Sequence, residues 1–257
     1  DPHAAMRWCL ARPYGDYTNR AAVYETFLDQ YPDSANELLA ILPDPKTRFE
    51  FSKARMTKML EKSPQDAITF IKSQSDAGIR DQLSISLGKQ LVKSDWALAA
   101  DLVKDLAANN VPLAYRTTCV EISENDHASM SQNPPAADLI MEMARKNPKG
   151  TFELASTIAG DGDQPGLLNS VQSTWIFADR YGFSEYLSNQ PPSPQRDKWT
   201  ENLVYDLTSH SVPSRNDYPS SIEWGLSIQN AEKKAEVVCE AATKWRRDDP
   251  AGFEAFL

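Results

Sequence analysis

Two neighbouring stretches of the chain repeat one pattern at an offset of 32 residues. The first stretch begins at Arg48 and the second at Arg80, and both place charged, aromatic and aliphatic residues in the same order. The aligned pairs are Arg48 with Arg80, Phe51 with Leu83, Met59 with Leu91, Leu60 with Val92, Ala67 with Ala99, Phe70 with Leu102 and Ile71 with Val103. A fixed period of this size indicates a repeat architecture, in which one supersecondary unit recurs along the chain.

Further copies can be aligned with the first stretch by finding the residue that is equivalent to Pro64. The candidate positions are Pro32, Pro64, Trp96, Pro134, Phe183, Pro219 and Pro250. Most copies have an apolar residue six positions later, but Asn189 and Gly225 break this column. The pattern is complete around Pro32, Pro64, Trp96 and Pro250, and incomplete around the other three.

Each copy reads as a pair of antiparallel helices. Apolar residues recur at helical spacing before the turn, and Ser63-Pro64 and Asp249-Pro250 combine an N-cap with proline at the first helical position. A lone hairpin of this kind cannot bury both of its apolar stripes, so neighbouring hairpins must stack. We therefore expect an all-α fold of αα-hairpins stacked as an α-solenoid. It would be a single repeat domain over residues 1–257, with a lead-in at 1–15 and about seven hairpins centred near the positions above.

Between the incomplete copies, helices are expected over Thr151 to Ala159 and over Leu167 to Tyr181, separated by a glycine-rich segment. That segment resembles the start of an EF-hand calcium loop, with Asp161 and Asp163 at loop positions one and three. Pro165 at position five and Gln172 at position twelve depart from the loop pattern. A turn between two helices is the preferred interpretation of residues 161–172, with an ion site as the alternative.

Charge and composition exclude several classes of function. The net charge of −9 is spread along the chain without a basic stripe, which disfavours nucleic-acid binding. No run of 18 apolar residues exists, so no membrane-inserted segment is expected. The three cysteines are far apart and odd in number, which fits neither a disulfide framework nor a metal site, and buried positions on helical stripes are expected for them.

The two ends of the sequence bear on compartment and completeness. Because the chain begins at Asp1 without methionine, a removed signal peptide and an exported protein are expected, and a cytoplasmic location stays open. The last helix is either a short cap or a truncated helix, since the sequence ends at Leu257. The sequence does not predict an oligomeric state.

Catalytic patterns are scarce. The three histidines, His3, His127 and His210, have no second potential ligand at helical spacing. No nucleophile elbow, phosphate-binding loop or dinucleotide fingerprint is present. No catalytic residue, cofactor or metal ligand is therefore predicted.

A family resemblance can be stated on three motifs. The Trp-x-x-x-Asp-Pro pattern at Trp245 to Pro250, together with Ser63-Pro64-x-x-Ala67 and Asp95-Trp96-x-x-Ala99, resembles hairpin repeats of uncharacterised, often exported proteins of planctomycete and verrucomicrobial bacteria. The architecture is also similar to tetratricopeptide and HEAT-like solenoids, although the full tetratricopeptide consensus is absent. The resemblance implies a binding scaffold and transfers no catalytic residue.

The leading hypothesis is a non-enzymatic scaffold that binds a protein or peptide across its second helices, which would line the concave face of the solenoid. The acidic residues among the candidates favour a cationic partner. The alternative is an extracytoplasmic carbohydrate-binding protein or enzyme that uses the polar insertions at 124–133 and 208–217 with Trp224 as an aromatic platform. The candidate partner-binding residues are Gln65, Asp66, Thr69, Lys72, Asp101, Lys104, Asp105, Asp138 and Trp224.

Overall fold

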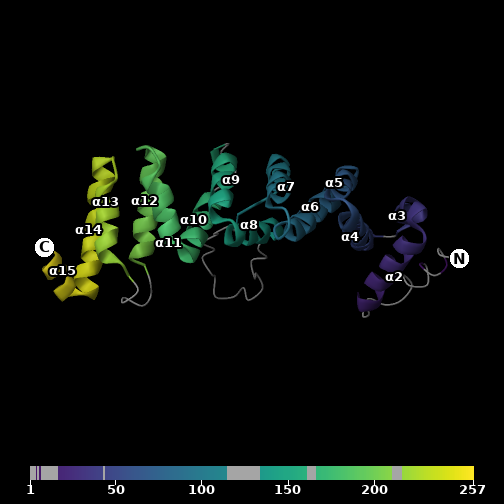
Figure 1. The fold of residues 1–257 in the computed structure, drawn as a ribbon, viewed down its shortest axis with the longest axis horizontal. Helices are drawn as coiled ribbons and strands as arrows, with labels where there is room; N and C mark the ends of the chain where they lie inside the picture. Colours follow the sequence, from purple (N-terminus) through teal and green to yellow (C-terminus); the bar gives the residue numbers. More distant parts are fainter. Residues whose placement is uncertain are drawn as a thin grey trace, which may run out of the picture. The chain divides into compact units, whose positions relative to one another are not determined.

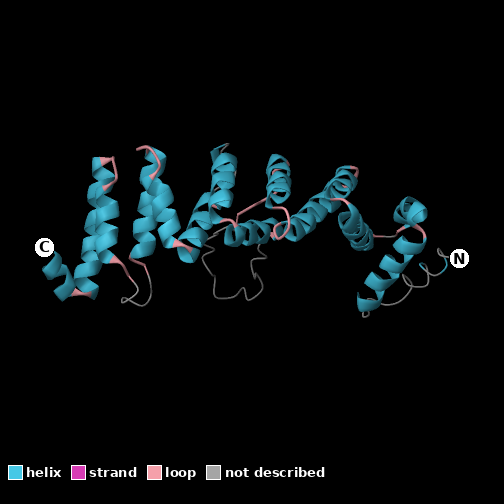
Figure 2. Cartoon of the chain, viewed as in Figure 1, coloured by secondary structure: helices cyan, strands magenta, loops and turns pink. Residues whose placement is uncertain are grey.

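The computed structural model describes residues 17–42, 44–114, 134–160, 166–209 and 216–257, together with Ala4 and Met6. Fourteen α-helices and one 3-10 helix cover most of these residues, and no strand occurs among them (Figures 1 and 2). The expected all-α class is confirmed. The helices pack mostly on their neighbours in sequence.

The described α-helices range from 7 to 18 residues in length. The helices, in chain order, are α2 (Tyr17–Gln30), η1 (Pro32–Ser34), α3 (Ala35–Ile41), α4 (Pro45–Lys62), α5 (Pro64–Lys72), α6 (Ala77–Leu91), α7 (Trp96–Ala108), α8 (Pro135–Lys146), α9 (Pro148–Gly160), α10 (Leu167–Ala178), α11 (Arg180–Ser188), α12 (Pro194–Leu207), α13 (Tyr218–Leu226), α14 (Ala231–Asp248) and α15 (Pro250–Phe256). From α4 onward we call the even-numbered helices first helices and the odd-numbered ones second helices.

The same kind of N-cap hydrogen bond is found at the start of each of the second helices, from α5 to α15. A Ser, Asp or Asn at the N-cap accepts a hydrogen bond from the backbone N–H three residues later, which satisfies one of the free amides of the first turn. The N-caps are Ser63, Asp95, Asn147, Asp179, Asp217 and Asp249, with donor-acceptor distances of 2.9–3.3 Å. All six of these helices share this N-cap, whereas only α5, α9 and α15 have proline directly after it.

Three of the seven expected turn positions do not coincide with the first residue of a second helix. Pro64, Trp96 and Pro250 are the first residues of α5, α7 and α15, as the repeat predicts. Phe183 instead lies inside α11, Pro219 is the second residue of α13, and Pro134 precedes a first helix. Asn147-Pro148, which reads in sequence as a helix end, also begins α9.

The expected continuous helix over Leu167 to Tyr181 is wrong. The chain breaks at Asp179, whose backbone has φ −154° and ψ 80° and whose carboxylate caps Gly182. The cap therefore splits an apolar run that helical periodicity alone would join.

The described helices fall into two compact units, which are considered separately. The first unit holds the described residues up to Leu113 together with the start of α8 to Glu142. Within it α4 packs along both α2 and α6, and the turns leave α5 and α7 as the second helices of α4 and α6. Gly88 lets α8 approach closely, because an added Cβ would lie 2.7 Å from a Leu139 methyl.

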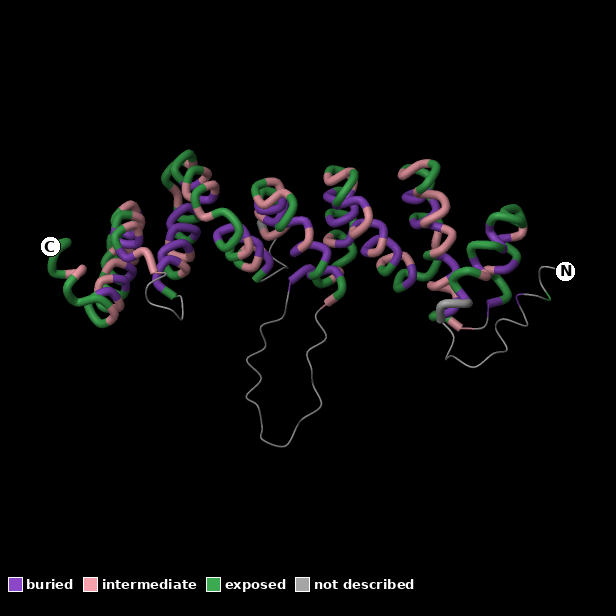
Figure 3. The backbone as a smooth tube through the Cα atoms, turned by 60° about the horizontal axis from the view of Figure 1, so that its bottom comes forward, coloured by how far each residue is buried: buried purple, intermediate pink, exposed green. Residues whose placement is uncertain are grey.

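The described part of the second unit runs from Met143 to Leu257, with α10, α12 and α14 packed in succession. Its core begins with an aromatic cluster around the fully buried Phe152, whose ring centroid lies 5.1–5.7 Å from those of Trp175, Phe183, Tyr186 and Trp199. A second cluster follows around Trp245 on α14. Buried positions recur along the facing sides of the helices, while turns are mostly exposed (Figure 3).

Candidate interaction surfaces

The predicted residues on the second helices are exposed, and several of them pair with one another. Gln65, Asp66, Thr69, Lys72, Asp101, Lys104, Asp105 and Asp138 all lie on the surface. Lys72 of α5 bridges to Asp105 of α7 at 3.2 Å, and Lys104 pairs with Asp101 at 2.8 Å on α7. Asp138 is on α8, a first helix, and lies 3.8 Å from Lys89 of α6. These ion pairs reduce the net negative charge that the acidic residues present.

The Lys72–Asp105 pair lies at an open cleft between α5 and α7. The cleft has a volume of about 350 Å³, and its floor is apolar while its rim is polar. Its lining residues are Ile68, Ile71 and Lys72 of α5, Arg80 and Ser84 of α6, Leu102, Asp105, Leu106 and Ala108 of α7, and Asn109. The four aliphatic residues at the floor are each less than a tenth exposed. Such a cleft accepts an apolar side chain, and its charged rim can orient the chain that carries it.

A groove on the first helices α12 and α14 consists of two parts that share Glu201. The larger part, about 730 Å³, is bordered by Pro192, Ser193, Pro194 and Lys198, and by Gln229, Asn230 and Lys233 on the α14 side. The smaller part, about 130 Å³, adds Glu236 and Glu240. Lys233 pairs with Glu201 at 3.0 Å and with Glu236 at 3.1 Å, and Lys244 pairs with Glu240 at 2.9 Å. The three glutamates of the groove are therefore all paired with lysines.

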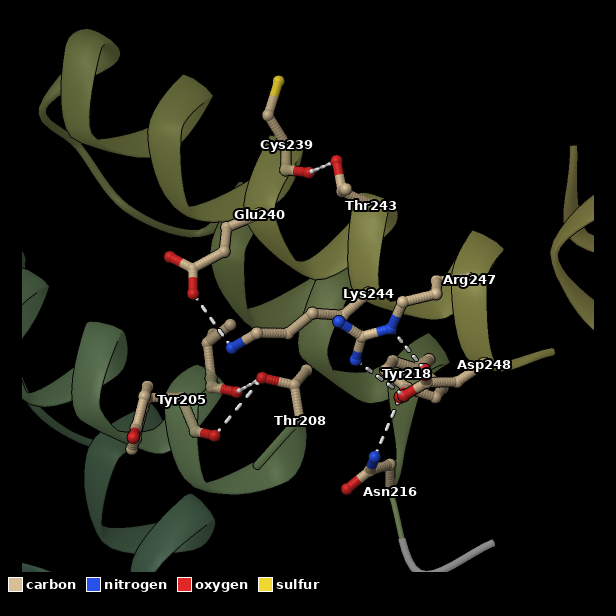
Figure 4. Close-up of polar contacts among 11 residues, drawn as sticks. Tyr205, Thr208, Asn216, Tyr218, Cys239, Glu240, Thr243, Lys244, Arg247 and Asp248 are labelled. Carbon is tan, nitrogen blue, oxygen red and sulfur yellow. Dashed lines mark hydrogen bonds and ion pairs between the residues drawn. The ribbon is translucent and has the colours of Figure 1, made fainter. Parts of the chain in front are cut away.

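Tyr205 stands at the edge of this groove and is 64% exposed. The ammonium group of Lys244 lies 5.1 Å from the centroid of its ring, within cation–π range. Figure 4 shows Lys244 extending between Glu240 and the α12 side of the groove. Tyr205 is an exposed aromatic residue that the sequence pattern did not single out, because helical periodicity indicates the exposed side of α12 without indicating which residue on that side has a function.

Trp224, the predicted aromatic platform, is partly buried. It packs against the cluster that contains Tyr218, Ile222, Val237 and Trp245. Much of its ring area is therefore part of the C-terminal core.

A polar cluster joins α13 to the end of α14. The Tyr218 hydroxyl donates to Asp248 at 2.5 Å and accepts from the Asn216 amide at 2.8 Å, while Arg247 donates to Asp248 at 2.7 Å (Figure 4). Burial, and then the carboxylate of Asp248, raise the pKa of Tyr218. Hydrogen bonds from Arg247 and Tyr218 lower the pKa of Asp248. Because the Tyr218 ring stacks on Trp245 at a centroid distance of 5.8 Å, the cluster ties the helix end to the core.

Several expectations fall partly or wholly outside the described residues. His3, His127, His210, Cys9, Cys119, Asp161, Asp163 and Pro165 lie there. Gln172, the twelfth residue of the segment that resembles a calcium loop, lies among the described residues. It is fully buried, donates a hydrogen bond to the carbonyl of Trp199 at 2.8 Å and accepts one from the Asn202 amide at 2.9 Å. Its amide is therefore occupied in the contact between α10 and α12. Cys239 is exposed on α14, contrary to the expectation of buried cysteines.

Across the described residues, no group of three or more His, Cys, Asp or Glu side chains has the arrangement of a metal site. Nor is any helix in that part of the chain long and apolar enough to cross a bilayer. Comparison with protein-family models, with curated proteins and with solved structures finds no match.

Proposed function

We propose that this chain is a non-enzymatic scaffold that binds a protein or peptide segment in the cleft between α5 and α7. The observation that carries the proposal is the combination of an apolar floor, formed by Ile68, Ile71, Leu102 and Leu106, with a polar rim. An apolar side chain of the partner would enter the cleft, and its backbone would cross the two helices.

The predicted residues form the surroundings of this cleft. Lys72 and Asp105 line it, and Thr69, Asp101 and Lys104 are exposed on the same two helices. A cationic group of the partner would compete with Lys72 for Asp105, which supports the expected preference for a cationic partner. Such a preference acts mainly through association rate and specificity.

The architecture gives the proposal its general class. We assign the chain to the hairpin-repeat proteins of α-solenoid type, on the strength of the repeated N-caps and the packing of helices on their sequence neighbours. Repeat proteins of this type present extended surfaces assembled from successive units, which suits a segment of a partner better than a small substrate.

The test begins with selection of peptides from a random display library on the intact protein. Selected peptides are then measured against Ala108→Trp, which places an indole at the mouth of the cleft. Ala97→Trp is the matched control, since Ala97 is also exposed on α7 but does not line the cleft. Loss of binding in Ala108→Trp alone, with shifts of the Ile68, Ile71, Leu102 and Leu106 methyl signals on peptide addition, supports the proposal. Equal binding by both variants overturns it.

A second candidate function is carbohydrate binding at the α12–α14 groove. The specific observation is the exposed ring of Tyr205 beside Glu201, Glu236 and Glu240 in one groove. An aromatic face can stack on a sugar ring while carboxylates accept from its hydroxyl groups. Binding on a glycan array that is lost in Tyr205→Ala and retained in Ala108→Trp would establish this function in place of the first.

A further inference from the structure

The groove on α12 and α14 is long as well as open. Its lining residues on α12 run from Pro194 to Tyr205, which is about 16 Å at the helical rise of 1.5 Å per residue. Its larger part, of about 730 Å³, lies within the range of roughly 300–1,000 Å³ that is typical of ligand sites. A single small ring would occupy only a fraction of this length, so the groove suits an extended occupant.

Each of the three glutamates in the groove uses one carboxylate oxygen in its ion pair. Lys233 contacts Oε1 of Glu201 and Oε2 of Glu236, and Lys244 contacts Oε1 of Glu240 (Figure 4). Among the described residues, no hydrogen bond reaches the second oxygen of any of these carboxylates. The glutamate side chains are 36%, 63% and 57% exposed in chain order. Three acceptor oxygens are therefore available to an occupant while every ion pair stays formed.

The charges of the groove are balanced. Lys244 pairs with a lining glutamate, and the buried Arg196 is next to the lining Asp197. A cationic occupant would have to displace a lysine from its carboxylate, and an anionic occupant would meet the glutamates. A neutral occupant can bind both members of an ion pair without separating them. The acidic side chains are Asp197, Glu201, Glu236 and Glu240, and the basic ones are Arg196, Lys198, Lys233 and Lys244.

Apolar surfaces lie toward both ends of the groove. The Tyr205 ring is 64% exposed even with the Lys244 ammonium group 5.1 Å from its centroid. Pro192 and Pro194 border the larger part and are exposed. Sugar rings combine faces of C–H groups, which stack on aromatic rings, with hydroxyl groups that both donate and accept hydrogen bonds. The groove offers contacts of both kinds.

We propose that the α12–α14 groove binds a neutral oligosaccharide that lies along α12. The inference rests on the second candidate function, carbohydrate binding at this groove, and names its substrate class. Hydroxyl groups of the sugar would donate to the available glutamate oxygens. They would also accept from the Lys198 ammonium group and from the amide of Asn230, whose oxygen is engaged by the Lys233 backbone N–H at 2.9 Å. One sugar ring would stack on Tyr205.

A peptide fits the same groove less well. Each backbone amide N–H only donates and each carbonyl only accepts, whereas one hydroxyl can accept from an ammonium group and donate to the carboxylate paired with it. Closely spaced ion pairs such as Lys233 with Glu201 therefore suit hydroxyl groups. The proposal is independent of the α5–α7 cleft, which shares no residue with this groove.

The test first screens the intact protein on a glycan array to find the sugar backbone that it binds. Calorimetry then compares a neutral hexasaccharide of that backbone with a cationic counterpart made of amino sugars and an anionic counterpart made of uronic acids. The neutral sugar is expected to bind about tenfold more tightly than either. Its affinity should change little between low and high salt, because no net charge is brought together. Affinity should also rise from the disaccharide to the hexasaccharide, since longer chains contact more of the groove.

Variants of Glu236 separate hydrogen bonding from charge. Glu236→Gln keeps an acceptor oxygen and should bind the neutral sugar within about twofold of the parent, whereas Glu236→Ala should bind about threefold to tenfold more weakly. Glu232→Ala is the matched control, because Glu232 is exposed on α14 and does not line the groove. Tyr205→Ala should weaken binding about fivefold to tenfold, with Tyr181→Ala as its control at another exposed ring. Circular dichroism and thermal unfolding verify that every variant is folded.

The outcomes distinguish the sugar class from carbohydrate binding itself. Tighter binding of the cationic or anionic counterpart, lost in Tyr205→Ala, would overturn the neutral class and leave carbohydrate binding at the groove intact. Binding of glycans that Tyr205→Ala and Glu236→Ala leave unchanged would overturn the site. Absence of glycan binding, or binding only of peptides at this groove, would overturn both the inference and the second candidate function.

Discussion

Asp197, buried in the first turn of α12, accepts the backbone N–H of Gln229 with both carboxylate oxygens, at 2.9 and 3.1 Å. The N–H of Asn230 adds a third bond at 3.0 Å. The adjacent Arg196, also buried, donates to the carbonyls of Leu187 and Ser227 at 3.3 and 3.4 Å. Two buried charges of opposite sign therefore hold the turn between α13 and α14 against the start of α12.

Asp197→Ala should lower the free energy of unfolding by about 2–4 kcal/mol, because the backbone amides of Gln229 and Asn230 lose a charged acceptor and the buried charge of Arg196 loses the opposite charge of its neighbour in sequence. Asp197→Asn should also destabilise, since its amide N–H₂ would face N–H donors. Urea unfolding of the purified variants measures both, with the exposed Lys198→Ala as control. A loss below about 1 kcal/mol for Asp197→Ala would show that water replaces the carboxylate without penalty.

Phe152→Ala should cost about 3–5 kcal/mol, because the ring is fully buried and contacts four other aromatic rings. Phe152→Leu should cost less, since it retains most of the apolar volume. Phe177→Ala is the control at an 87% exposed ring and should change stability by less than about 0.5 kcal/mol. Thermal and urea unfolding followed by tryptophan fluorescence report on this cluster directly.

Gly88→Leu should destabilise the contact between α6 and α8 by about 1–3 kcal/mol, because even a Cβ at this position meets a Leu139 methyl at 2.7 Å. Leu139→Ala in the same chain should restore part of the loss, since it removes the opposing methyl groups. A double-mutant cycle on urea unfolding measures the coupling. Additive effects of the two substitutions would mean that the cost of Gly88→Leu does not come from the Leu139 methyl groups.

The Tyr218–Asp248 pair should make stability depend on pH at both extremes. The lowered pKa of Asp248 means that its contribution is present above about pH 4 and is lost as pH falls through the folded pKa. The raised pKa of Tyr218 means that its contribution is present below about pH 10 and is lost as pH rises through the folded pKa.

Tyr218→Phe should remove the alkaline part of this dependence, and Asp248→Asn the acid part. Thermal unfolding across pH measures the stability, and the difference in tyrosinate absorbance between the parent and Tyr218→Phe isolates this hydroxyl. An absorbance difference that titrates like free tyrosine would contradict the raised pKa.

Asp179→Ala should lower stability by about 1 kcal/mol, the typical contribution of an N-cap. Asp249→Ala, at the last cap, should unfold mainly α15, since no helix follows it in the described chain. Hydrogen exchange resolves the two cases, because loss of protection should be confined to Gly252 and its neighbours only in the second variant.

The turns at Pro64, Trp96 and Pro250 could be predicted because cap, period and apolar stripe agree there. At Asn147-Pro148 they do not: asparagine followed by proline can end one helix or begin the next, and only the capping bond to Gly150 decides. The apolar run from Leu167 to Tyr181 wrongly predicts one continuous helix for a related reason. Helical periodicity continues through Asp179, although the backbone does not.

In the candidate surfaces, too, some features follow from the local sequence and others depend on tertiary contacts. Exposure of Lys72 and Asp105 follows from their positions on α5 and α7, but the ion pair and the cleft beside it require the two helices to lie side by side. Asp197 would be read from sequence as an acidic residue in a first turn. Its burial depends on Gln229, which is 32 residues away and arrives only when α14 packs on α12.

The sequence by itself determined the helical class and the helix starts at Pro64, Trp96 and Pro250, because capping bonds and apolar spacing act over a few residues. The tertiary structure decided which exposed charges pair, where clefts open and which carboxylate is buried. These depend on contacts between residues far apart in the chain, and no local pattern records them.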